Sequence, residues 1–398
     1  MSDTSTAPVS PSGTFKTLLQ VPEWIKPTAH LGSRRGLWWR RSRERFVWAD
    51  LDAGASETID FPDLPADGDV SMYADRRRLL RKHGTSFELW HCERGLVARR
   101  AVPPAPPSVE PLLRGRPQQE LHWLSGDDRH LWYMGYDDHG APLLYLFDAS
   151  TLQLRDSVGP PMSIGRVASH VPAPRDWCGA PQRFTTYPGG EPVGLFSPSC
   201  DELGYLMWLA VRPEGTIDDR ATPGLRRAAA ATSDTVATYL RAPQADRILA
   251  FTDLHEVHRV DLKTEAIDRS ASFLAPFESE RDPDLLEVAP YRGSVRSTDL
   301  WLTEVVATAA HIYLDLSLSP HVSEDDANAL GDFPWRFFVM LDAATLQPVG
   351  FVDPYALGGD AEEVQAVDLL EDGTIAVQLA GAERSHATRI VEWTAASA

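Results

Sequence analysis

Side chains that could take part in catalysis or binding gather in four long stretches between the apolar segments of the chain. Carboxylates and imidazoles can exchange protons, and carboxylate oxygens can hold a divalent cation. Tryptophan and arginine are enriched among the residues that dominate binding at protein interfaces. The stretches are 135–142 with Asp137, Asp138 and His139; 159–192 with His170 and Trp177; 274–297 with Glu280, Arg281 and Asp282; and 318–335 with His321, Asp325, Asp326 and Trp335.

No familiar catalytic motif accompanies these residues. The sequence has no Gly-x-Ser-x-Gly elbow, no P-loop and no Gly-x-Gly-x-x-Gly dinucleotide motif. His255 and His258 are three residues apart, a spacing that points them to opposite faces of a strand and disfavours a shared metal. Acidic pairs such as Asp325–Asp326 could bind a divalent cation through their carboxylate oxygens. No other cofactor is predicted.

The segments that must position these residues are short and apolar, and polar turns separate them, which predicts many β-strands. Two kinds of hairpin recur. The first has a polar turn with Asp or Arg, at 123–133, 31–38, 73–80, 196–206, 240–250, 306–313 and 369–377. The second carries Asp-x-x-Thr, at Asp148–Thr151, Asp261–Thr264 and Asp342–Thr345, with looser copies at 47–54 and 89–96.

The two hairpins alternate along the chain, so each pair predicts one four-stranded antiparallel sheet with strands A, B, C and D. Seven repeats of about 57 residues fit in the chain of 398 residues, somewhat longer than the roughly 40–50 residues usual for propeller blades. A lone sheet cannot cover both of its faces, so the repeats must pack against each other. The sequence predicts an all-β fold, a single β-propeller of seven four-stranded blades. A β-sandwich or two smaller β domains are the alternatives.

Two turn motifs carry a resemblance to known proteins. Asp-Ala-Ala-Thr at 342–345 and Ser-Gly-Asp-Asp-Arg at 125–129 resemble turns of the YVTN-type and TolB-type bacterial propellers. The resemblance covers most of residues 28–395 and implies a fold, without a specific family or activity. None of the 12 tryptophans precedes an aspartate, and Gly-Gly occurs only at 189–190 and 358–359, which speaks against the WD-repeat and kelch subclasses. The single Asn328 counts against the calcium-binding lactonase type.

The last repeat contains only three predicted strands, near 364–369, 374–380 and 388–393. The apolar segment Phe15–Val21 precedes the first repeat, and we expect it to pair beside 388–393 and close the ring. Residues 1–13 are rich in Ser, Thr and Pro and are expected to form a disordered tail. Residues 14–398 then form the single propeller domain.

Strand direction predicts where the long stretches lie. Successive strands run in opposite directions, so A–B and C–D turns share one end of a sheet, and B–C and D–A connections share the other. All four stretches, and the shorter 353–363, are assigned as B–C or D–A connections and should build one acidic face. The stretch 212–232 is also long, but the fourth repeat is too weakly patterned to place it.

Composition narrows the partners and the compartment. The net charge of −19 disfavours nucleic acid and anionic membranes as partners. No run of 18 apolar residues and no signal-peptide pattern occurs, which predicts a cytoplasmic protein. Cys92, Cys178 and Cys200 form no Cys-x-x-Cys pair and are expected to be reduced, with Cys92 on a strand.

The function that these observations favour is binding. A cytoplasmic propeller would bind a protein partner or a small ligand through the face that carries the B–C and D–A connections. The alternative is a hydrolase or lyase whose acidic and histidine residues form an active site over the central channel. A third class, a structural subunit of a larger assembly, would use the rim of the propeller. Whether the chain is an enzyme is left open.

Overall fold

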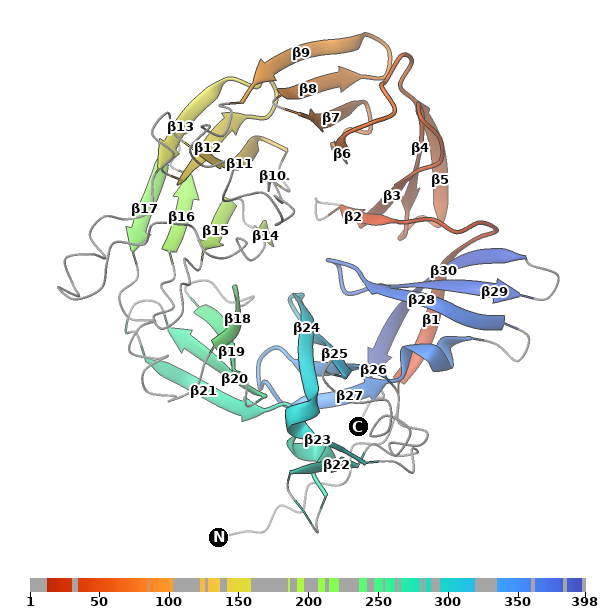
Figure 1. The fold of residues 1–398 in the computed structure, drawn as a ribbon, viewed down its shortest axis with the longest axis vertical. Helices are drawn as coiled ribbons and strands as arrows, with labels where there is room; N and C mark the ends of the chain where they lie inside the picture. The colour runs from red at the N-terminus through yellow and green to blue at the C-terminus, as the bar shows by residue number, and fades with distance from the viewer. Residues whose placement is uncertain are drawn as a thin grey trace, which may run out of the picture. The chain divides into compact units, whose positions relative to one another are not determined.

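The structure of the chain is a computed structural model, drawn in Figure 1. It describes residues 13–30, 35–84, 86–102, 122–125, 128–136, 142–158, 185–186, 192–196, 207–211, 215–221, 236–241, 247–252, 255–261, 264, 266–279, 282, 284–287, 294–318, 335–358, 362–381 and 385–395. Within these ranges no helix is long and apolar enough to cross a membrane.

The described strands pair into seven four-stranded antiparallel sheets and one two-stranded sheet, with three short 3-10 turns as the described helical elements. This confirms the prediction of an all-β chain built on four-stranded antiparallel sheets, the arrangement found in the blades of a β-propeller. The chain divides into two compact units, which we call the central unit (His30–Arg227) and the terminal unit (Met1–Ala29 with Ala228–Ala398).

The first four sheets of the chain contain strands β2 to β17, in chain order within each sheet. They are β2 (Thr28–His30), β3 (Gly36–Arg40), β4 (Arg45–Asp50) and β5 (Ala55–Asp60); β6 (Asp69–Met72), β7 (Arg78–His83), β8 (Ser86–His91) and β9 (Gly95–Ala101); β10 (His122–Leu124), β11 (His130–Tyr136), β12 (Pro142–Asp148) and β13 (Leu154–Val158); and β14 (Thr185–Thr186), β15 (Pro192–Phe196), β16 (Met207–Val211) and β17 (Ile217–Ala221).

The remaining strands belong to the terminal unit. Its sheets are β18 (Val236–Arg241), β19 (Arg247–Thr252), β20 (Glu256–Asp261) and β21 (Ile267–Ser272); the pair β22 (Leu285–Glu287) and β23 (Ser294–Arg296); β24 (Leu300–Ala307), β25 (His311–Leu318), β26 (Arg336–Asp342) and β27 (Pro348–Val352); and, in this spatial order, β1 (Gly13–Val21), β30 (His386–Ala395), β29 (Ile375–Gly381) and β28 (Glu362–Leu369). The 3-10 turns are η1 (Ala275–Phe277), η2 (Ser297–Asp299) and η3 (Pro354–Leu357).

The N-terminal strand completes the last sheet of the chain. β1 pairs with β30, with Phe15 opposite Trp393 and Val21 opposite Thr388, and Figure 1 shows the red β1 beside the blue β30. The predicted pairing of Phe15–Val21 with residues near 388–393 is therefore confirmed. The residues after β1 stay attached to the same sheet, because Trp24 Nε1 donates to the Leu379 carbonyl at 3.0 Å.

The Asp-x-x-Thr hairpins form as predicted, each between the third and fourth strands of a sheet. In one of them Asp148 Oδ1 accepts hydrogen bonds from the backbone N–H groups of Ser150 and Thr151, at 3.0 and 2.9 Å. Asp342 Oδ1 accepts from Ala344 and Thr345 in the same way, at 3.1 and 2.7 Å. The turn is thus encoded locally, because the aspartate side chain caps its own backbone.

The fourth sheet differs from the sequence-based assignment. The segment 196–206, predicted as an A–B turn, joins the second strand β15 to the third strand β16. The stretch 159–192 is not a single connection, because it contains the first strand β14, and β17 lies within 212–232. The assignment failed because β14 is only two threonines long and has no apolar alternation to recognise. Cys92 was also wrongly placed, since it lies in the turn after β8.

Alternate residues of the strands fill two different cores, as the alternation of a strand requires. In the sheet β24–β27, Leu314 and Val339 belong to a cluster with Phe251 of the preceding sheet. Tyr313 and Phe338 belong to another cluster, with Val377 of the following sheet. Full burial of each such side chain contributes about 1.5–3 kcal/mol, so both faces of this sheet depend on a neighbouring sheet.

We expect the attachment of the N-terminal segment to depend on the buried Thr388. Its Oγ1 donates to the Glu23 carbonyl at 2.9 Å and accepts from the Ile25 N–H at 3.0 Å. In Thr388→Val the two hydrogen bonds to the hydroxyl are lost, so the free energy of unfolding should fall by about 1–3 kcal/mol in urea denaturation. Thr394→Val, at an exposed position of the same strand, is the control and should change it by less than about 0.5 kcal/mol.

The C–D turns should give the fold a dependence on pH. Burial raises the pKa of Asp148, but hydrogen bonds from Arg155, Ser150 and Thr151 outweigh it and hold the pKa well below its ordinary value. A lowered folded-state pKa stabilises the fold above the unfolded pKa, and this contribution is lost as the pH falls. Asp148→Asn should therefore lower the urea midpoint at pH 7, and the difference from wild type should shrink towards pH 3. Asp52→Asn, at an exposed turn position, is the control.

Candidate functional site

Most of the residues predicted from the sequence as site residues lie outside the described part of the structure. These are Asp137, Asp138, His139, His170, Trp177, Glu280, Arg281, His321, Asp325 and Asp326. Asp282 and Trp335 are described, and both are exposed. Among the described residues no group of three or more His, Cys, Asp or Glu side chains could hold a metal ion.

Asp282 lies in an insert with structure of its own, between β21 and β24. The insert contains η1, the β22–β23 hairpin and η2, and it buries Phe277, Leu286 and Val295 in a core cluster. Asp282 Oδ1 accepts from the Asp284 N–H at 3.1 Å, and its carbonyl accepts from the Leu285 N–H at 3.0 Å. The described hydrogen bonds of Asp282 thus stabilise a turn. The apolar residues of this insert pack into the core.

Trp335 is one of three exposed aromatic side chains at the same end of the sheet β24–β27. Trp335 precedes β26 and is 59% exposed, Trp301 is the second residue of β24 and is 52% exposed, and Tyr355 on η3 is 45% exposed. Register places them together along the sheet, because Leu300 pairs with Leu318, Ser317 with Arg336, and Val352 with Phe338. This is the end that carries the B–C and D–A connections, and we call it the BC/DA end.

A buried histidine from the preceding sheet fixes the strand that carries Trp301. His255 Nε2 lies 3.1 Å from the carbonyl oxygen of Leu300. The ring packs edge-on against Phe273 at 5.7 Å, and the backbone of His255 has a φ of 60°, which a non-glycine residue rarely adopts. His258 makes a different contact, with Ser270 Oγ at 2.7 Å. His255 and His258 therefore contact different residues and do not face a common site.

An ion pair supports the same end of the sheet. Asp315 is fully buried, and Arg336 Nε donates to its Oδ1 at 2.7 Å while Nη2 donates to its Oδ2. Arg336 Nη1 also donates to the Val367 carbonyl of the next sheet. Burial lowers the pKa of Arg336, but the hydrogen bonds and attraction of Asp315 outweigh it and raise the pKa overall. The guanidinium of Arg336 is therefore held in one position.

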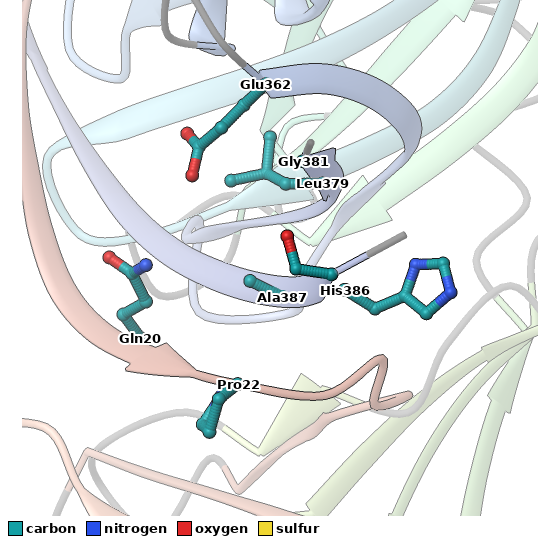
Figure 2. Close-up of a pocket in the computed structure, with 8 residues that line it drawn as sticks. Gln20, Pro22, Glu362, Leu379, Gly381, His386 and Ala387 are labelled. Carbon is teal, nitrogen blue, oxygen red and sulfur yellow. The ribbon is translucent and has the colours of Figure 1, made fainter. Parts of the chain in front are cut away.

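A pocket of about 510 Å³ lies at the BC/DA end of the terminal sheet, where β28 and β30 begin and β29 and β1 end. Figure 2 shows Glu362 and Gln20 on one side of the hollow, with the ring of His386 directed away from them. The lining residues are Gln20, Pro22, Glu362, Leu379, Gly381, Ser385, His386 and Ala387.

The acidic and imidazole groups of this pocket are engaged separately. Glu362 Oε2 accepts from Arg389 Nη2 at 2.7 Å. The ring of His386 lies against Trp24 in a tilted arrangement, with 4.1 Å between the ring centroids. Glu362 and His386 point apart and do not contact each other.

Sequence reasoning missed Glu362, His386, Trp24, Trp301 and Tyr355. The run Leu300-Trp301-Leu302 is apolar throughout, so it gives no sign that its middle residue is exposed. The pocket joins residues near 20 with residues near 362 and 386, and only the register of the last sheet brings them together. The predicted β1–β30 pairing was the one signal that could have pointed there.

Comparisons with known proteins add little to this geometry. No family model matches the sequence. No curated protein matches it either. Among solved structures, a chain of one titled "Crystal Structure of Mitotic Checkpoint Complex" is 9% identical, with 98% of this chain and 95% of that chain covered and a TM-score of 0.46. A likeness at this level says nothing about what the present chain binds.

The buried pair beneath the aromatic residues can be tested by double substitution. Arg336→Met leaves the fully buried Asp315 carboxylate without its partner, so the free energy of unfolding should fall by about 3–5 kcal/mol. Asp315→Leu combined with Arg336→Met removes both charges and should recover most of that loss, as urea denaturation would measure. A double variant no more stable than Arg336→Met would contradict this account.

Proposed function

We propose that the chain is a single seven-bladed β-propeller that binds a protein partner through the BC/DA ends of its sheets. The observation that carries the proposal is the set of exposed aromatic residues Trp301, Trp335 and Tyr355 at the BC/DA end of one sheet. Large aromatic side chains lose hydrophobic stabilisation while they face water, and Trp and Tyr dominate the centres of protein interfaces.

The distribution of the exposed aromatic residues supports this choice of surface. Among the described residues, five aromatic side chains are exposed: Phe15, Trp24, Trp301, Trp335 and Tyr355. All but Phe15 lie at the BC/DA end of their sheet, and Phe15 lies near the opposite end, at the start of β1.

Three of the long stretches predicted from the sequence connect strands at the BC/DA end of their sheets. The stretch 135–142 joins the second and third strands of its sheet, as does 318–335, and 274–297 follows a fourth strand and precedes a first. We propose that the acidic and histidine residues of these stretches contribute to partner binding. A cytoplasmic location and kinship with YVTN-type and TolB-type propellers stay predictions of the sequence. Most of the acidic and histidine residues on which the hydrolase or lyase alternative rests lie outside the described part of the chain.

The proposal is tested by affinity enrichment on the immobilised chain from an extract of its own organism. Wild type should retain a defined protein that the double variant Trp301→Ala/Trp335→Ala loses. Each hot-spot residue is worth about 2 kcal/mol or more, a factor of roughly 30 in the dissociation constant. The purified partner is then titrated against each variant by calorimetry.

The matched control removes exposed apolar residues from another surface. Leu96 and Val97 are 42% and 44% exposed on β9, at the opposite end of their sheet. Leu96→Ala/Val97→Ala should bind the partner like wild type. If this variant loses the partner and Trp301→Ala/Trp335→Ala keeps it, the interface lies on the rim and the proposal is wrong.

A further inference from the structure

The geometry points to a second binding site: the pocket bounded by Glu362 and His386 takes a small ligand with a primary ammonium group and an apolar body. This site does not use the three aromatic residues that carry the proposed protein interface, because none of Trp301, Trp335 and Tyr355 lines the pocket. Its volume of about 510 Å³ falls within the range of small-molecule sites.

The hollow exists because small residues meet at the ends of two neighbouring strands. Gly381 ends β29, and Ala387 is the second residue of β30. Leu379 pairs with Ala387, and Glu362 pairs with Gly381, so the small positions lie between larger side chains. A side chain at 381 would meet Ser385 Oγ at 2.6 Å. Leu379, Ala387 and Pro22 give the pocket an apolar lining for the body of a ligand.

The carboxylate of Glu362 has capacity for one further donor. Oε2 accepts from Arg389 Nη2 at 2.7 Å, and among the described residues Oε1 accepts no hydrogen bond. The side chain is 28% exposed, so it is partly withdrawn from water. Glu88 of the central unit shows that a carboxylate of this chain can serve two cations, because Arg81 and Arg99 both donate to it.

The single remaining oxygen decides which cation fits. A guanidinium prefers to bind both oxygens of a carboxylate through two parallel N–H bonds. Arg389 already occupies one oxygen of Glu362, so this bidentate arrangement is closed. An ammonium group is a compact charge that can donate to one oxygen. The site therefore favours a primary amine over a guanidinium compound.

The His386 side of the pocket is held by contacts of the fold. The ring of His386 lies against Trp24, with 4.1 Å between the ring centroids and 43° between the ring planes, and Trp24 Nε1 donates to the Leu379 carbonyl. Arg389 Nη1 donates to the Leu357 carbonyl at 3.2 Å, which fixes the guanidinium that orients Glu362. Because both walls are held by bonds of the fold, a ligand would meet a preformed site and lose less free energy in ordering it.

The test uses 2-phenylethylamine, which is an ammonium ion at pH 7, and 2-phenylethanol as its neutral counterpart. Ligand-observed NMR on the full chain measures both affinities, and backbone amide shifts locate the site. The amine should bind with a dissociation constant of about 1 mM, as expected for a ligand of this size. The alcohol should bind at least tenfold more weakly, and amide shifts should centre on Gly381 and Ala387. Equal affinity for the alcohol would overturn the assignment of the charge.

Three variants separate the possible causes. Glu362→Gln should weaken the amine at least tenfold, whereas Glu363→Gln, at the exposed neighbouring position, should leave it unchanged. Ala387→Leu fills the hollow without touching the Glu362–Arg389 pair and should abolish binding. Wild-type affinity in Glu362→Gln or in Ala387→Leu would overturn the site. Trp301→Ala/Trp335→Ala should bind the amine normally, so failure of the protein interface and failure of this pocket give different results.

Discussion

Coverage of both faces of a four-stranded sheet is the constraint on which the rest of this structure depends. The sheet β24–β27 has apolar residues on each face, and they belong to two separate clusters shared with the sheets before and after it. Burial on both sides leaves most polar side chains at the strand ends, in the turns and along the outer edges. Binding residues are therefore expected there, because the two faces are already used for packing.

Polar pairs occur inside this apolar arrangement at equivalent places. In one sheet Arg81 of the second strand pairs with Glu88 of the third, at 2.6 Å and with both side chains almost fully buried. In another, Asp315 of the second strand pairs with Arg336 of the third, so the charges are exchanged. Each pair lies in the half of its sheet next to the B–C connection. A buried pair adds little net stability, yet it strongly penalises any arrangement that separates the partners.

The candidate surfaces lie where packing between sheets leaves side chains exposed or space unfilled. Trp301, Trp335 and Tyr355 are exposed near the BC/DA end of the sheet β24–β27, beside the buried residues Leu300 and Leu318. The pocket beside Glu362 arises where Gly381 and Ala387 leave the end of the terminal sheet unfilled. The insert between β21 and β24 shows the opposite outcome, since its apolar residues are drawn into the core. The candidate binding surfaces are thus made of residues that the packing of the sheets does not cover.

The sequence by itself determined the features that depend on neighbours in the chain. It predicted the Asp148 and Asp342 turns, because each aspartate caps its own backbone, and it predicted the strand pattern of the well-patterned sheets. It also predicted the β1–β30 pairing, because one strand was missing from the last repeat. Only the tertiary structure decided the strand order around β14 and the exposure of Trp301. The pocket that joins Gln20 to Glu362 and His386 was decided there as well. An apolar residue has the same periodicity whether or not a second sheet covers it, so exposure depends on where the neighbouring sheet ends.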